Sequence, residues 1–324
     1  MKSKKAITLT PLNLLALLIG FALPASFTWA ASDPAGSSGA GNKAAKEAIR
    51  VCTKCHDETD EKPILAILKT KHAMMADKRT PFADQACITC HGPSQKHLEK
   101  PPEGQKRALT DISFAASSPT APEKKNAVCM SCHESGLRLH WKGSPHEFSG
   151  LACSSCHTVH TGKDPVLVKR TQPEACFTCH KEKRAQIYRP STHPIREGKV
   201  SCADCHNPHG SSGPKQLAKN SVNETCYQCH YEKRGPFLWE HAPVRDDCTN
   251  CHKPHGSIHP ALLKNRQPWL CQQCHLAQFH PSGAYSGTGI PPMGADQRLL
   301  GKQCLNCHTQ VHGSNHPSGV RLTR

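Results

Sequence analysis

Ten copies of the pattern Cys-x-x-Cys-His run through this chain of 324 residues and account for all 20 of its cysteines. The first cysteines are Cys52, Cys87, Cys129, Cys153, Cys176, Cys202, Cys226, Cys248, Cys271 and Cys304. The second cysteines are Cys55, Cys90, Cys132, Cys156, Cys179, Cys205, Cys229, Cys251, Cys274 and Cys307. The histidines that follow them are His56, His91, His133, His157, His180, His206, His230, His252, His275 and His308. Whatever these ten units hold must dominate the fold.

The spacing within each unit matches the attachment of a c-type haem. Two thiols at this separation reach the two vinyl groups of one porphyrin, and the adjacent histidine then lies over the iron as its proximal ligand. Cys-x-x-Cys also begins structural zinc sites, and cysteine-rich exported chains usually form disulfides. Neither alternative requires a histidine after every pair, and histidine fills only 23 of the 324 positions. The pattern therefore predicts ten covalent haem c groups, which we number sites 1 to 10 in chain order.

The remaining histidines are numerous enough to give every iron a second axial ligand. Taking the motifs two at a time defines five blocks, and each block has one histidine before its second motif and one just after it. The upstream histidines are His72, His146, His193, His241 and His280. The downstream histidines are His97, His160, His209, His255 and His312. These ten are the predicted distal ligands, although the sequence does not say which of them serves which site.

Three further histidines, His140, His259 and His316, are expected on the solvated surface, although any one could replace a member of the distal set. Methionine is the alternative axial ligand, with Met74, Met75 and Met293 as the candidates. Because substrate chemistry at iron needs an open or weakly held axial position, a full set of His/His sites favours electron transfer over catalysis.

The N-terminus reads as an export signal. Lys2, Lys4 and Lys5 precede an apolar run of residues 12–25, and a small residue, Ala30, ends the segment. An uncleaved anchor is the alternative, but a transmembrane helix needs about 20 apolar residues. We therefore predict a signal peptide at residues 1–30 and a flexible tether at 31–41. An N-terminal two-haem module with a Pro- and Lys-rich loop follows at 42–128, and repeated two-haem modules for sites 3 to 10 occupy 129–324.

The fold class follows from the thin supply of apolar side chains. Aromatic residues make up 5% of the chain, so the porphyrins must supply most of the apolar mass. We predict a multihaem cytochrome c that is mostly coil, with short α-helices at 42–51 and 63–78, single turns at the motifs and little or no β-structure. Its ten haems are expected to form an elongated array of about five two-haem modules, with longer loops at 92–127 and 276–303.

The formal charge of +16 at pH 7 does not predict a nucleic-acid partner. Three lysines leave with the signal, and each ferric haem with two ionised propionates adds about −1. The excess of lysine and arginine therefore largely balances propionates. No groove of interleaved basic and aromatic residues for single strands is evident.

Together these motifs resemble the exported decahaem cytochromes of the MtrA, DmsE and PioA type, over nearly the whole mature chain. The resemblance rests on ten motifs in about 300 residues and the two-haem period, together with Cys-x-x-Cys-His-x-x-His-Gly at 202–210 and 248–256. One departure is at His97, which lies six residues past His91 instead of three. In the last block His312 lies four residues past His308, so the three-residue spacing is absent at both ends of the chain.

The resemblance implies a periplasmic electron conduit that sits inside an outer-membrane β-barrel porin. Its implied partners are periplasmic or inner-membrane quinol-linked c-type cytochromes on one side and an extracellular cytochrome or terminal reductase on the other. Two alternatives stay open: a soluble periplasmic shuttle that donates to a reductase, and a multihaem oxidoreductase acting on nitrite or hydroxylamine. The direction of electron flow does not follow from the sequence.

Overall fold

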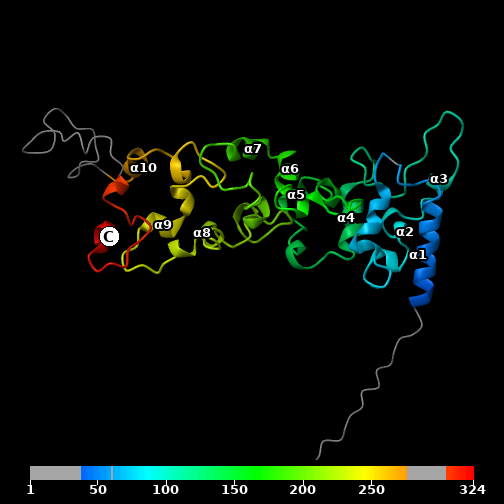
Figure 1. Cartoon of the computed structure of the whole chain (residues 1–324), viewed down its shortest axis with the longest axis horizontal. Helices are drawn as coiled ribbons and strands as arrows, with labels where there is room; N and C mark the ends of the chain where they lie inside the picture. The colour runs from blue at the N-terminus through cyan, green and yellow to red at the C-terminus, as the bar shows by residue number, and fades with distance from the viewer. Residues whose placement is uncertain (1–37, 60, 276–303) are drawn as a thin grey trace, which may run out of the picture. The chain divides into compact units, whose positions relative to one another are not determined.

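The computed structural model describes residues 38–59, 61–275 and 304–324, which belong to one unit beginning at Ser38. Its helices follow one another in sequence order (Figure 1). They are α1 (Ser38–Cys52), α2 (Cys87–His91), α3 (Gln95–Leu98), α4 (Pro122–Met130), α5 (Pro145–Phe148), α6 (Gln172–Phe177), α7 (Lys181–Ile187), α8 (Val222–Cys226), α9 (Ala242–Asp246) and α10 (Trp269–Gln272). The predicted signal peptide, residues 31–37 of the tether and the loop at 276–303 lie outside the described residues.

Short 3-10 turns and irregular segments connect these helices. The turns are Ile64–Lys69, Lys71–Ala73, Pro81–Ala83, Gly136–Arg138, Cys153–Ser155, Pro165–Leu167, Cys202–Asp204, Pro214–Gln216, Tyr231–Lys233, Cys248–Asn250, Pro260–Leu262, Cys304–Asn306 and Gly319–Arg321. The described part of the chain forms no strand, only four isolated β-bridges. The predicted fold class of mostly coil with short helices is confirmed.

The two longer helix predictions had different outcomes. The helix expected at 42–51 is present as α1, which starts four residues earlier, inside the predicted tether. The helix expected at 63–78 is wrong, because two 3-10 turns separated by the extended residue Thr70 occupy that segment. The Thr70 hydroxyl donates to the Ile67 carbonyl at 2.7 Å, a local bond of the kind by which threonine competes with helix formation.

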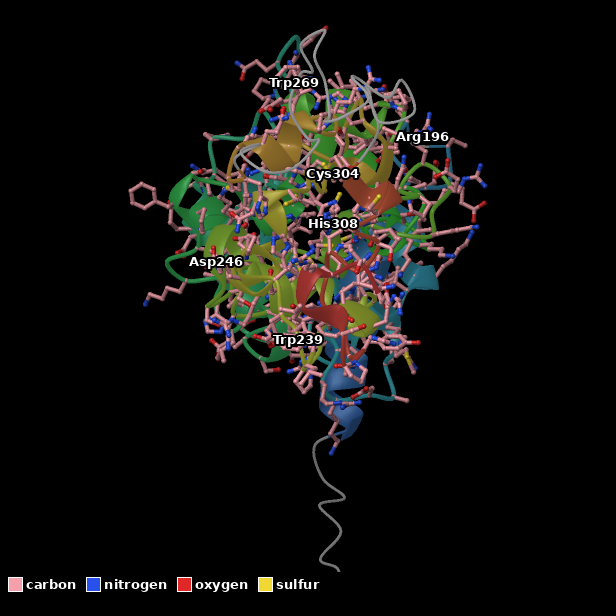
Figure 2. The ribbon with its side chains drawn as sticks, turned by 90° about the vertical axis from the view of Figure 1, so that its left-hand side faces the viewer. Arg196, Trp239, Asp246, Trp269, Cys304 and His308 are labelled. Carbon is pink, nitrogen blue, oxygen red and sulfur yellow. The ribbon has the colours of Figure 1, made fainter. Side chains whose placement is uncertain are left out.

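Each Cys-x-x-Cys-His motif forms one helical turn. In nine motifs the histidine N–H donates to the carbonyl of the first cysteine at 2.9–3.1 Å, from His56 to His308, and the tenth motif is α2 itself. Figure 2 shows the result at the last motif, where Cys304 and His308 lie next to each other. Because the turn is closed, the first cysteine and the histidine are presented together on one side of the motif.

Most buried apolar residues among those described form two small clusters, and Trp141 and Ala152 are buried outside them. Ala45, Ala48, Phe82 and Ala86 are buried in the first, between α1 and α2. The second consists of Phe177, Ile187 and Ile195, around α6 and α7. No helix of the described residues is both long and apolar enough to cross a membrane. The porphyrins, not side chains, are therefore the main candidates to fill the interior.

Candidate haem sites

Nine of the ten motif histidines face a second histidine ring. The pairs are His56 with His97, His91 with His160, His133 with His72, His157 with His209, His180 with His146, His206 with His255, His230 with His193, His252 with His312 and His275 with His241. Every second member belongs to the predicted distal set. The tenth predicted ligand, His280, lies outside the described residues.

The separation of these rings fits one iron between them. Ring centroids in the nine pairs are 5.9–6.3 Å apart. A bond of about 2 Å from each Nε2 to a metal, plus about 1.1 Å from that atom to its ring centroid, gives a span of about 6 Å. The donor set also fits, because each pair stands beside two cysteines of one attachment motif. The residues present therefore suit bis-histidine haem c.

Hydrogen bonds fix the orientation of many of these rings. The Nδ1 atoms of His97, His146 and His193 donate to the carbonyls of Ala108, Pro208 and Pro254 at 2.7–3.0 Å. The same bond is made by His91, His160, His206, His241, His252 and His308. An imidazole that donates through Nδ1 keeps Nε2 free for a metal. These carbonyls thus set both the tautomer and the orientation that iron requires.

Burial keeps several downstream histidines neutral, which is the form that binds metal. Burial, followed by the nearby positive charge of Lys183, lowers the pKa of His255 to about 4. Burial is also the largest cause of the lowered pKa of His209 and His312. The Nδ1 of His209 is buried without a hydrogen-bond partner, as is the Nε1 of Trp141, whose ring lies 6.4 Å from that of His209.

The facing pairs cross from block to block in a reciprocal pattern. At each of the four junctions, the upstream histidine of one block faces the first motif of the next. The downstream histidine of that next block faces the second motif of the one before. His193 of block 3, for example, faces His230 of block 4, while His255 of block 4 faces His206 of block 3. Among the described histidines, His97 alone faces a motif of its own block, at His56.

Hydrogen bonds also connect the two exchanged histidines at a junction, through the main chain next to one of them. His146, His193 and His241 donate to the carbonyls of Pro208, Pro254 and Val311, the residues just before the downstream histidines of the next block. At the first junction His160 donates to the carbonyl of Ile64 instead, eight residues before His72. Each junction is therefore closed by two facing pairs and at least one hydrogen bond.

Glycine follows the downstream histidine where two segments of chain nearly touch. Gly256 has φ +137°, and a Cβ there would lie 2.0 Å from the Gln186 carbonyl oxygen of the preceding block. Gly210 has φ +99° and would clash with the His140 carbonyl in the same way. Beyond Gly256, Ser257 and Ser191 exchange two main-chain hydrogen bonds of 2.8 and 3.0 Å. Only glycine allows this close crossing.

The attachment cysteines place consecutive sites beside each other. Within block 1 a hydrogen bond between thiols lowers the pKa of Cys52 to about 6 and raises that of Cys87. The first cysteines of blocks 2, 3 and 4 pair likewise. Between blocks, burial and then the Cys132 charge raise the pKa of Cys90. The two sites of each of these four blocks are therefore neighbours, and so are sites 2 and 3.

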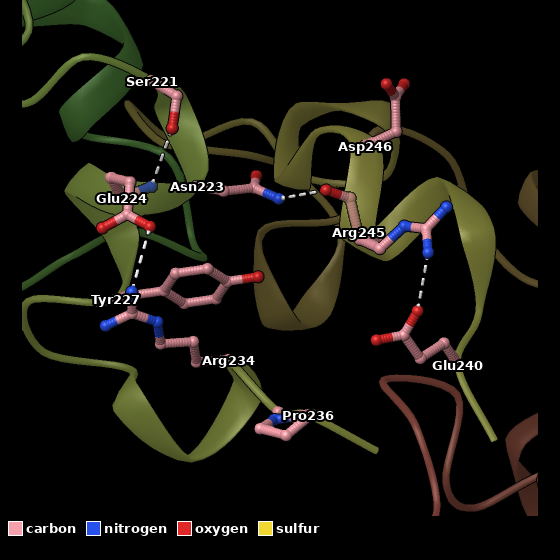
Figure 3. Close-up of a pocket in the computed structure, with 10 residues that line it drawn as sticks. Ser221, Asn223, Glu224, Tyr227, Arg234, Pro236, Glu240, Arg245 and Asp246 are labelled. Atoms are coloured by element: carbon pink, nitrogen blue, oxygen red, sulfur yellow. Dashed lines mark hydrogen bonds and ion pairs between the residues drawn. The ribbon is translucent and has the colours of Figure 1, made fainter. Parts of the chain in front are cut away.

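Asparagine side chains form hydrogen bonds that link the two motifs of a block. In block 4 Asn223 donates to the carbonyls of Val244 and Arg245 at 2.9 and 3.0 Å and accepts from the Cys248 N–H at 2.7 Å. Figure 3 shows Asn223 reaching from α8 to the main chain of Arg245 on α9. In block 2 Asn126 makes the matching bonds to Leu151 and Cys153. Asn223 also lines the surface pocket shown in Figure 3.

The other candidate ligands are not part of any facing pair in the described residues. His140 and His316 are exposed, and His259 is half-buried. Met74 is 52% exposed, while Met75 packs against the first apolar cluster. Met293 lies outside the described residues. The loop at 92–127 has a role that the sequence did not predict, because its carbonyls at Ala108 and Ile112 accept from His97 and His91.

Comparison with known proteins agrees with this architecture. The family model described as a doubled CXXCH motif matches residues 193–235 and 241–279, and one described as cytochrome c-type protein NrfB-like matches 87–172. The multiheme cytochrome MtrA of Shewanella baltica is 46% identical over 275 residues, which covers 84% of this chain and 80% of that protein. The chain belongs to the MtrA family of multihaem cytochromes.

More distant relatives of this MtrA-family chain share only part of it. The cytochrome c-type protein NrfB of Haemophilus influenzae is 28% identical over 41% of this chain and 65% of its own length. The C-type polyheme cytochrome OmcB of Geobacter sulfurreducens is 29% identical over 26% of this chain. The similarity to MtrA over 84% of the chain, together with the doubled CXXCH motif, shows that the chain binds haem c covalently and is an electron-transfer protein.

Proposed function

We propose that this MtrA-family chain conducts electrons along ten bis-histidine haem sites, across the outer membrane, inside a β-barrel porin. The distal ligands are His160, His72, His209, His146, His255, His193, His312 and His241 for sites 2 to 9 in order, with His97 for site 1 and His280 for site 10. The observation that supports this role most directly is the unbroken series of facing pairs.

Haem c, when bound, supplies a one-electron iron couple at each site. The chain's own contribution is to close both axial positions with neutral imidazoles. Since an open or weakly held position is what substrate chemistry at iron requires, this closure suits relay sites better than reaction centres. The interactions between attachment cysteines within blocks 1 to 4, and between Cys90 and Cys132, support a relay between neighbouring sites.

The conduit proposal further assigns the chain to the periplasmic side of the outer membrane, after cleavage of residues 1–30. One end would accept electrons from or donate them to periplasmic or quinol-linked cytochromes, and the other would meet an extracellular cytochrome or reductase. The similarity to MtrA over 84% of the chain supports this assignment. The match of residues 87–172 to the NrfB-like model supports the second candidate, a soluble periplasmic shuttle.

Fractionation of cells that produce the full chain separates these two functions. We expect the haem-stained band in the outer-membrane fraction, released only by detergent and in a stable complex with a β-barrel protein. The mature N-terminus is expected at Ala31. A band that stays wholly in the osmotic-shock fluid, with no membrane partner, would establish the shuttle instead.

Replacement of His209 by alanine tests the ligand assignments. His209→Ala is expected to leave all ten haems covalently attached and to convert one of the ten, at site 4, from low spin to high spin. The matched control is His259→Ala, which removes a histidine of the next block that faces no motif and should leave the spectrum unchanged. Electronic absorption and electron paramagnetic resonance of the ferric proteins give the readout. A wholly low-spin His209→Ala protein would remove His209 from the ligand set.

A further inference from the structure

Site 4 differs from sites 6 and 8 in the group that its proximal histidine contacts. Nine axial histidines of the described residues donate from Nδ1 to a main-chain carbonyl. His157 instead donates to the carboxylate of Asp164, with Nδ1 and Oδ2 2.7 Å apart. At site 7 the Glu232 carboxylate lies 3.9 Å from the Nδ1 of His230, beyond hydrogen-bonding distance.

The internal repeat shows that Asp164 replaces a main-chain acceptor. Asp164, Gly213, His259 and His316 occupy one repeated position, four residues past the downstream histidine and directly before a proline. In blocks 3 and 4, the carbonyl two residues past this position accepts from the proximal histidine, at Lys215 and Ala261. Those two residues have φ +52° and +53°.

In block 2 the same loop has a different backbone conformation. Here the side chain at the repeated position, in place of a main-chain carbonyl, accepts the hydrogen bond from the proximal histidine. Asp164 keeps an ordinary φ of −66°, and neither of the next two residues has a positive φ. Its carboxylate therefore stands where the other two blocks place a neutral carbonyl. The three loops form an internal comparison in which the charge of the acceptor is the main chemical difference.

The Asp164 carboxylate is held in place and shielded. Its Oδ1 accepts from the main-chain N–H groups of Thr158 and Val166, both at 3.3 Å. The side chain of Asp164 is 13% exposed and that of His157 is 33% exposed. Since a charge in such a setting is weakly screened by solvent, its effect on the neighbouring ring is larger than that of a surface carboxylate.

We propose that Asp164 lowers the reduction potential of site 4 below that of the equivalent sites 6 and 8. A carboxylate that accepts the Nδ1 proton draws positive charge from the imidazole, so Nε2 becomes a stronger donor to iron. A stronger donor stabilises the ferric over the ferrous state, and second-sphere hydrogen bonding is one of the means by which proteins tune haem potentials. The inference rests on the proposed assignment of His157 and His209 to site 4. Among the three sites whose proximal loops can be compared in this way, site 4 is then the one that accepts an electron least readily.

Spectropotentiometric titration of the purified full-length holoprotein tests this role. Asp164→Asn keeps the shape and an acceptor oxygen but removes the charge. We expect one of ten one-electron components to shift toward easier reduction, by about tenfold in its ferric/ferrous equilibrium, or about 59 mV. Asp164→Ala, which also removes the hydrogen bond, should shift the same component at least as far. All ten haems should stay low spin in both variants.

Glu232→Gln is the matched control, because it removes an equal charge near another proximal histidine, at a longer distance and with the Glu232 side chain 50% exposed. Its titration should lie much closer to that of the unchanged protein. The inference is overturned if Asp164→Asn and Glu232→Gln shift the titration equally, or if Asp164→Asn shifts nothing. A high-spin haem in Asp164→Asn would also overturn it, because Asp164 would then act by holding His157 in place. None of these outcomes affects the membrane fractionation, so the conduit proposal is tested separately.

Discussion

A chain that ends at Arg266, before the first motif of block 5, is expected to carry eight covalent haems, one of them high spin. The two missing haems leave with sites 9 and 10. The high-spin haem is site 8, because its facing histidine, His312, belongs to the deleted block. His241 loses its own site, since it faces His275. Site 7 keeps His193 and stays low spin.

Pyridine haemochrome analysis gives the haem count for this truncation, and magnetic circular dichroism gives the spin states. The control is His312→Ala in the full chain, which removes the same ligand without deleting a block. It should retain ten haems and show the same single high-spin haem. If the truncated chain has eight low-spin haems, each block completes its own ligation and the reciprocal pattern is wrong.

Block 1 has a different geometry, because its downstream histidine, His97, faces His56 of its own block. The spacing of six residues between His91 and His97, where blocks 2 to 4 have three, gives the chain room for this pairing. The loop at 92–127 then supplies the carbonyl of Ala108 to the Nδ1 of His97. The longer spacing at His97 therefore accompanies a pair formed within one block.

The sequence predicted the sites far better than it predicted their connections. The motifs identify the attachment residues directly, because each one places two attachment cysteines and the proximal histidine within five positions. The upstream and downstream histidines could be sorted by position alone. Their partners could not, because the two members of a pair such as His193 and His230 come from different blocks. Local spacing carries no information about a contact between blocks.

Two other misses have local physical causes. The apolar residues of segment 63–78 have the spacing of a helix. However, the Thr70 hydroxyl donates to the Ile67 carbonyl, and the backbone at Thr70 is extended. Asp164 belongs to none of the motifs, so its role depends on a comparison with the equivalent residues of the other blocks. Aligning the residue that precedes the proline in each block, which gives Asp164, Gly213, His259 and His316, would have shown that one acidic residue stands out.

The same chain made without haem is expected to have no cooperative folding transition. Ordering a chain costs about 1–2 kcal/mol per residue in backbone entropy, and apolar burial is the main term that offsets it. The two apolar clusters contain only seven buried residues between them, at α1, α2, α6 and α7. Blocks 4 and 5 contribute none to these clusters. The reciprocal junctions also depend on iron, because each facing pair of imidazoles leaves about 6 Å between ring centroids that only a metal and its ligand bonds would span.

Production in cells that lack the machinery for c-type haem attachment, followed by purification with the thiols reduced, gives the haem-free chain for this test. Its far-ultraviolet circular dichroism should change gradually with temperature, and protease should cut it throughout. The holoprotein should melt in one transition and resist protease within residues 42–275. A single sharp transition in the haem-free chain would mean that side chains alone specify the fold. The sites would then be preformed before attachment, and the ligands at each junction would be held by the backbone contacts between blocks, such as those of Ser191 with Ser257 and of Trp239 with Ser314.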